Sequence, residues 1–305
     1  MISIYPMPMS TTMKNSITDI KDFYQNKCKT CDGTGYEGTF TNEFGLQSKI
    51  PCGYCGKKIE YLTTFILSGV PKTYVHIDSV SKKLYDEDKK FMKDLIADIK
   101  EAPEQMRFIC LASTSKGVGK TGTMVYVVKE HYKALKQIYP DMELSPITWI
   151  TASFLVKNLY KDIEKNKMKD EEKESYKAFM DSVMMNPILV IDGLGDHFIK
   201  PGVKGDEQYI TNRMEEVFRY RQEQGLSIYC TSNYPLFHFN EQGYAEGGGG
   251  IGANDGTPTI LDKYGERFCG LWQRHDCVWY KWETLNPIRA IESASKSRIS
   301  KYRKI

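Results

Sequence analysis

One segment of the sequence has glycines, a lysine and a threonine in the order that a phosphate-binding loop requires. The segment is Thr114-Ser-Lys-Gly-Val-Gly-Lys-Thr121, and it lies between an apolar run and a helical pattern, where such loops occur. Glycine lets backbone N–H groups turn toward phosphate oxygens, and here those groups precede the positive end of a helix. The segment therefore predicts a binding site for the phosphates of a nucleotide.

The side chains of this loop have separate predicted roles. Lys120 can reach the β- and γ-phosphates, and the Thr121 hydroxyl can ligate Mg²⁺. The loop departs from the usual pattern at its first position, where Thr114 replaces a glycine. A chance turn is the alternative, which the strand before the loop and the helix after it disfavour. The residues predicted to contact the nucleotide are Ser115, Lys116, Gly117, Val118, Gly119, Lys120, Thr121 and Gly122.

An acidic residue ends a second apolar run, Ile188-Leu-Val-Ile-Asp192. A phosphate-binding loop needs a carboxylate at the end of a nearby strand to hold the metal ion, so Asp192 is the predicted acid on the Mg²⁺ side. Many ATPases of this kind have a glutamate next, whereas this chain has Gly193. Either Asp196 activates the attacking water or hydrolysis is slow, and an ordinary loop residue is an equally good interpretation of Asp196.

Polar residues also end a third apolar run, Ser227–Asn233. If this strand lies in the same parallel sheet, Asn233 or Thr231 could orient a water molecule beside the γ-phosphate. A strand-ending turn closed by the asparagine side chain is about as good an interpretation of the segment alone.

Four of the eight cysteines form two Cys-x-x-Cys pairs, Cys28 with Cys31 and Cys52 with Cys55. This spacing matches a site in which four thiolates bind Zn²⁺, and a full tetrahedral shell makes such a site structural rather than catalytic. A redox dithiol is the alternative for one pair, but two matched pairs disfavour it. The other four cysteines are scattered through apolar stretches, which indicates a reducing, cytoplasmic setting.

The elements that must position these groups alternate between short apolar runs and helical patterns. Strands are predicted at residues 107–112, 147–151, 188–191, 227–231 and 277–282, and helices at 82–100, 119–137, 153–165, 171–185 and 207–224. This alternation predicts an α/β fold whose parallel sheet is covered by helices on both faces.

Taken in order, five segments resemble the DnaC/DnaI/IstB group of AAA+ ATPases, which are bacterial and phage helicase loaders with transposition helpers as relatives. The segments are Leu67–Tyr74, the phosphate loop, Ile191–Gly195, Thr231–Asn233 and Tyr264–Arg267. The resemblance implies a five-stranded AAA+ P-loop NTPase core that binds ATP and Mg²⁺. It also implies binding of single-stranded DNA and delivery of a hexameric, DnaB-type replicative helicase onto DNA in a bacterial or phage-infected cell.

The resemblance assigns further residues by position. Asn233 takes the sensor position, and Arg289 resembles a second sensor arginine. Arg267 and Arg274 are the candidates for an arginine that contacts the γ-phosphate held by a neighbouring subunit. Such an arginine would require self-association into a ring or filament, although each arginine alone is more often a surface residue.

In this family, the helix after the second strand faces single-stranded DNA. Phe154, Lys157 and Tyr160 in that helix combine rings that can stack on bases with a charge that can pair with phosphate. The alternative is an ordinary amphipathic helix that buries Phe154 with Leu155 and Leu159, and for Phe154 the pattern slightly favours this alternative.

We divide the chain into an N-terminal extension at 1–27, a zinc-ribbon-like module at 28–70 and an AAA+ ATPase domain at 71–305 with a basic C-terminal tail. The module is too small to fold by hydrophobic burial alone, which agrees with a structural metal. In the resembling family such a module commonly binds the helicase, and direct contact with DNA is the alternative.

Composition is that of a soluble protein, with 41% hydrophobic and 27% charged residues. The formal net charge of +3 is too small to indicate nucleic-acid binding by itself. No apolar run is long enough to span a bilayer, and the first residues lack the order of a signal peptide, so we expect no membrane partner.

Three functions remain open from the sequence. The leading one is an ATP-dependent helicase loader whose ATPase is slow and stimulated by DNA or a partner. The second is an IstB-like transposition regulator that coats double-stranded DNA. The third is an ATP-bound scaffold that does not hydrolyse, which Gly193 and Thr114 suggest.

Overall fold

A computed structural model describes residues 17–22, 25–26, 28–41, 47–77, 86–113, 117–140, 146–163, 168–196, 204–236, 259–273 and 277–281. Five strands form one sheet, namely β3 (Phe108–Ala112), β4 (Ile147–Thr151), β5 (Ile188–Leu194), β6 (Ser227–Ser232) and β7 (Cys277–Lys281). They lie in the order β4-β5-β6-β3-β7, and every neighbouring pair is parallel. The predicted parallel sheet is confirmed, and each of the five apolar runs contributes a strand.

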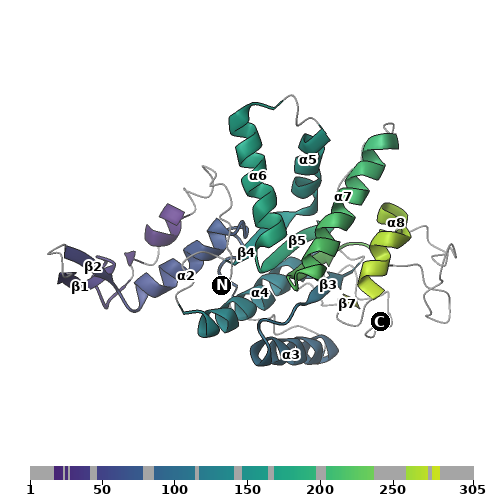
Figure 1. Ribbon diagram of the computed structural model, residues 1–305. Coiled ribbons are helices and arrows are strands. Elements are labelled where there is room, and N and C mark those ends of the chain that lie inside the picture. The colour runs from purple at the N-terminus through teal and green to yellow at the C-terminus, as the bar shows by residue number, and fades with distance from the viewer. Residues whose placement is uncertain are drawn as a thin grey trace.

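Helices cover both faces of this sheet, as Figure 1 shows. One face packs against α5 (Ala152–Ile163), α6 (Asp170–Met185), α7 (Lys204–Glu223) and α8 (Ile260–Gly270). The other face packs against α2 (Cys55–Leu67), α3 (Asp86–Glu101) and α4 (Lys120–Ile138). The five predicted helices are confirmed with ends shifted by a few residues, whereas α2 and α8 were not predicted.

The side chains of β3 show why two separate cores form. Phe108 and Cys110 belong to the core under α5 to α8, while Ile109 and Leu111 belong to the core under α2 to α4. Successive residues of a strand point to opposite faces, so a central strand with two covered faces is apolar throughout. All five residues of β3 are buried accordingly.

A two-stranded antiparallel hairpin, β1 (Tyr36–Thr41) with β2 (Gln47–Pro51), precedes α2. Helix α2 then begins at Cys55 in the cysteine module and continues to Leu62 and Phe65, which are fully buried in the core beside α4. One helix therefore joins the cysteine module to the core of the sheet, and the domain boundary at residue 70 stays a prediction.

Lys129, in the middle of α4, binds the segment that follows α2 through hydrogen bonds to two of its backbone carbonyl groups. Its side chain is fully buried, and its ammonium group donates hydrogen bonds to the carbonyl oxygens of Val75 and Ile77 at 2.6 and 2.9 Å. The same ammonium group lies 5.4 Å from the ring centre of Tyr61 and 5.5 Å from that of Phe65, both on α2. A buried ammonium group needs such partners because it has lost its water.

Among the helices of the described ranges, none combines the length and the apolar character that crossing a lipid bilayer requires.

Candidate functional site

The predicted phosphate loop lies between the end of β3 and the start of α4, at the carboxyl edge of the parallel sheet. Gly117 and Gly119 have φ angles of 76° and 86°, in the left-handed region that favours glycine. A Cβ atom added at Gly119 would meet nothing within 4 Å, so the backbone angle rather than lack of space explains this glycine. Ser115 and Lys116 lie outside the described residues.

The first turn of α4 meets the acid predicted on the metal side. The hydroxyl of Thr121 donates a hydrogen bond to Oδ1 of Asp192 at 2.9 Å, and the ammonium group of Lys120 bonds the Ser113 carbonyl at 3.1 Å. Asp192 therefore lies beside the helix that follows the loop, although β6 separates β5 from β3 in the sheet. The two predicted halves of the nucleotide site stand together at one edge of the sheet.

These groups fit a magnesium ion. A hydroxyl that gives its hydrogen to a carboxylate keeps lone pairs for a cation, and Mg²⁺ prefers hydroxyl, carboxylate and phosphate oxygens. Thr121 and Asp192 are thus the residues that could hold Mg²⁺ next to a bound triphosphate.

Thr231 of β6 is also bonded to the metal-side acid. Its hydroxyl donates to Oδ1 of Asp192 at 2.5 Å and accepts the backbone N–H of Gly193 at 2.9 Å. A hydroxyl has only one hydrogen to donate, so Thr231 has none left for a water molecule. Of the two residues predicted to orient water, Asn233 is therefore the better placed.

Asn233 and Asp196 form a pair at the open edge of the site. The Asn233 amide nitrogen donates to Oδ2 of Asp196 at 2.7 Å, so this side chain reaches the turn that follows Asp192. Gly193 has a φ of 75°, and a Cβ atom added there would lie 2.9 Å from the same Asp196 oxygen. The turn thus brings the Asp196 carboxylate into the space where a side chain at position 193 would start.

The predicted trans-acting arginines are only partly described. Arg267 on α8 has a side chain that is 78% exposed, and its Nε lies 3.7 Å from an oxygen of Glu215 on α7. Helix α8 has a kink at Gly265, where φ is 77°. The Arg267 guanidinium is therefore exposed on α8, while Arg274 and Arg289 lie outside the described residues.

Helix α5 carries the residues predicted to bind DNA. Phe154 is 47% exposed, with its ring packed edge-on against Phe179 of α6, so the slight preference for a buried Phe154 is wrong. Lys157 is exposed and Tyr160 is half-buried. Leu155 belongs to the buried face, as expected. An aromatic ring and a lysine one turn apart are thus available on the surface of α5.

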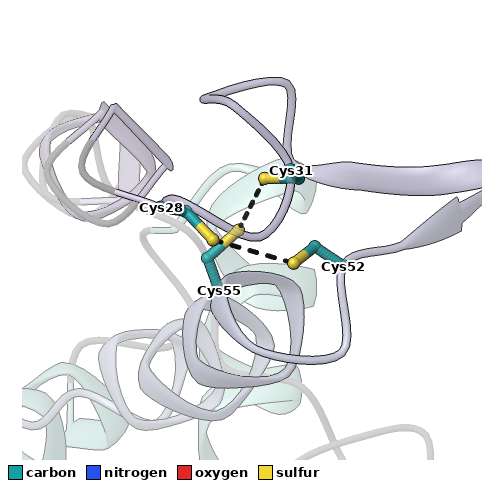
Figure 2. Close-up of side chains that lie close together, drawn as sticks. All are labelled: Cys28, Cys31, Cys52 and Cys55. Carbon is teal, nitrogen blue, oxygen red and sulfur yellow. Dashed lines mark hydrogen bonds between the residues drawn. The ribbon is translucent and has the colours of Figure 1, made fainter.

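The four paired cysteines converge from both sides of the hairpin, as Figure 2 shows. All four are buried, and their sulfur atoms lie within 4.8 Å of one another. The Cys28–Cys52 and Cys31–Cys55 sulfur distances are 3.8 and 3.5 Å. Zinc–sulfur bonds of about 2.3 Å in a tetrahedron place sulfur atoms about 3.8 Å apart, so the cluster fits Zn²⁺. The N–H of Gly35 donates to the Cys31 sulfur at 3.2 Å, an outer contact typical of such sites.

The thiols of this cluster differ in acidity. Burial acts to raise the pKa of Cys28, but hydrogen bonds from the backbone of Cys31 and Thr30 lower it from 9.0 to about 6. At Cys55, burial and hydrogen bonds with the neighbouring thiols raise the pKa. The protein alone thus favours a thiolate at one position and opposes it at another, and a bound cation would permit four thiolates together.

No family model matches this sequence, and no curated protein is similar to it. Among solved structures, the chain is similar to the DnaC helicase loader, with 18% identity, a TM-score of 0.44, and coverage of 68% of this chain and 96% of that one. It is similar to DnaI with 15% identity, a TM-score of 0.38, and coverage of 71% and 93%. It is also similar to domain III of the Thermotoga maritima replication initiation protein DnaA, with 14% identity, a TM-score of 0.40, and coverage of 67% of this chain and 64% of that one.

The fold class is that of the AAA+ P-loop NTPases, because five parallel strands are flanked by helices and the glycine loop lies between β3 and α4. The solved structures include DnaC and DnaI, the group that the sequence resembles. At identities of 18% and 15%, the similarity concerns the fold alone.

We expect that removing one cysteine of the cluster abolishes zinc binding, because three thiolates no longer fill the tetrahedral shell. Purified wild-type protein should contain about one zinc per chain, and the Cys52→Ser variant about none, by atomic emission spectroscopy. Cys269→Ala, at a buried cysteine outside the cluster, should keep its zinc. Acid should release the metal because protons compete for the thiolates. Equal zinc content in the two variants would contradict the assignment.

Proposed function

We propose that the protein is an ATP- and Mg²⁺-dependent AAA+ ATPase that binds single-stranded DNA and loads a hexameric, DnaB-type helicase onto it. The observation that carries the nucleotide part is the 2.9 Å hydrogen bond between Thr121 and Asp192. It joins the helix after the glycine loop to the acid near the carboxyl end of β5, the arrangement that a metal-bound triphosphate requires.

In this proposal each described residue has a definite task. The N–H groups of the loop around Gly117 and Gly119 and the ammonium group of Lys120 hold the phosphates, while Thr121 and Asp192 hold Mg²⁺. The bound Mg²⁺ would neutralise charge that develops on the phosphate oxygens.

The water-activating task falls to Asp196, oriented by Asn233. The 2.7 Å hydrogen bond between them and the space left by Gly193 support this assignment. Asp196 lies three residues after Gly193, the position that a glutamate usually occupies. We therefore expect slow ATP hydrolysis that DNA or a partner protein accelerates. A scaffold without hydrolysis is the competing function, and the glycine at position 193 favours it.

The DNA-binding part rests on α5. Phe154 offers a ring that is 47% exposed, and Lys157 adds positive charge one helical turn away, a combination suited to stacking on bases beside phosphates. Exposed Arg267 is a candidate for contact with a neighbouring subunit in a ring or filament. The family resemblance motivates the helicase as partner and the zinc module as its contact.

Lys120→Ala should lower ATP affinity by about ten- to a hundredfold, because a charged group that bonds the phosphates is lost. Binding of a fluorescent ATP analogue measures this, with circular dichroism to verify the fold. Asp196→Asn is the matched variant: it should keep ATP affinity but slow hydrolysis by about a hundredfold or more. Unchanged affinity in Lys120→Ala would refute the phosphate site, and unchanged turnover in Asp196→Asn would refute the assigned base.

Phe154→Ala should weaken binding of a single-stranded oligonucleotide by roughly tenfold, because a stacking ring is removed. Fluorescence anisotropy with ATP and Mg²⁺ present measures the affinity for single- and double-stranded DNA. Ile163→Ala is the control, because Ile163 is an apolar residue of α5 that is 42% exposed and is not assigned to DNA. Equal losses in both variants, or tighter binding of the duplex, would contradict the proposal; tighter duplex binding would favour the transposition regulator.

The helicase partner is tested directly by size-exclusion chromatography with a purified DnaB-type hexamer. We expect co-elution with ATP and Mg²⁺, and transfer of the helicase to circular single-stranded DNA. Failure of candidate hexamers to co-elute, while ATP and DNA still bind, would remove the loader assignment and leave a DNA-binding ATPase.

A further inference from the structure

We propose that Thr231 is a positioning residue for the metal-side acid: its hydroxyl holds the Asp192 carboxylate and thereby sets the affinity of the nucleotide site for Mg²⁺. This inference rests on the proposed nucleotide function. It goes further because it assigns Thr231 a role on a different strand from the acid.

The sheet order brings Thr231 to this place. Strand β6 lies between β5 and β3, and the neighbour of Thr231 in the register, Cys230, pairs with Ile191, the residue before Asp192. On the other side of β6, Thr231 pairs with Leu111 of β3. Thr231 is 2% exposed, so water competes little for its hydroxyl.

One hydroxyl thus fixes two parts of the site at once. It donates to the carboxylate of Asp192 at 2.5 Å and accepts the backbone N–H of Gly193 at 2.9 Å. The carboxylate and the turn that follows β5 therefore keep a defined position relative to β6.

Two hydroxyls meet at the same carboxylate oxygen, because Thr121 also donates to Oδ1 of Asp192. Thr121 is itself a candidate Mg²⁺ ligand, so Thr231 is the partner that can hold the acid without contacting the metal. Groups that orient metal ligands in this way commonly change metal affinity or activity by about ten- to a hundredfold when they are removed.

A purely structural role is the competing explanation, and Thr148 provides the comparison. Thr148 of β4 is fully buried, donates to the Ser182 carbonyl at 2.9 Å and accepts from the Asn186 amide at 2.8 Å. It therefore makes one donated and one accepted bond, as Thr231 does, but near the amino end of its strand. Loss of either hydroxyl leaves hydrogen-bond partners unsatisfied. Of these two threonines, only Thr231 contacts Asp192.

The experiment compares Thr231→Val, Thr231→Ser and Thr148→Val in the full chain. Binding of a fluorescent ATP analogue is titrated with Mg²⁺, the nucleotide affinity is measured again in EDTA, and urea unfolding reports stability. We expect Thr231→Val to raise the half-saturating Mg²⁺ concentration by about tenfold or more, with nucleotide affinity in EDTA unchanged. Thr231→Ser, which keeps the hydroxyl, should stay close to wild type. Thr148→Val should lose stability without moving the Mg²⁺ midpoint.

The inference is overturned if folded Thr231→Val has the wild-type Mg²⁺ midpoint, or if Thr148→Val shifts the midpoint as much as Thr231→Val does. Thr231→Ala removes the same hydroxyl with a smaller side chain and serves if the valine variant does not fold. Wild-type protein that binds no nucleotide with Mg²⁺ would instead refute the proposed function itself. The two failures are thus distinguished by the wild-type titration.

Discussion

The Asp192 carboxylate is the point on which the arrangement of the site depends. It accepts hydrogen bonds from Thr121 on α4 and from Thr231 on β6, so three separate elements are fastened together at one oxygen atom. Hydrogen bonds donated to a carboxylate are stronger than those between neutral groups, so these two hydroxyls hold the Asp192 side chain in a defined position. The order β4-β5-β6-β3-β7 supplies these donors, because β6 lies between the acid and the strand that leads into the glycine loop.

The turn after Asp192 separates the two carboxylates to which we assign the metal ion and the attacking water, Asp192 and Asp196. Gly193 has no side chain, and its left-handed backbone lets the chain fold back so that Asp196 lies against it. Gly195 is constrained in a different way, because a Cβ atom there would lie 2.6 Å from the ring of Tyr234. Asp192, the proposed metal-side acid, is therefore half-buried and bonded to neighbouring elements, while Asp196 is exposed and paired with Asn233.

The cysteine module and the sheet are parts of one continuous framework. Helix α2 begins at a predicted zinc ligand, Cys55, and its other end is buried beside α4. Lys129 on α4 faces the rings of α2 and bonds the carbonyls of Val75 and Ile77. Ile77 in turn approaches Gly122 in the first turn of α4, where an added Cβ atom would lie 3.0 Å from it. The cysteine cluster and the first turn of α4 are thus connected by a short run of packed residues.

Local chemistry determined much of this protein from its sequence: the glycine loop, the cysteine pairs and the apolar runs each lie within a few consecutive residues, and their types alone limit what they can form. Only the tertiary structure decided which hydroxyls hold Asp192, because strand order and register bring Thr231 to it from 39 residues away. The tertiary structure also decided that Phe154 is exposed. Helical periodicity defines which face of a helix is apolar, but not how much of the edge of that face a neighbouring helix buries. Helix α8 was not predicted, because Gly265 interrupts the helical pattern of its residues. Packing of its apolar side chains against the core stabilises this helix nonetheless.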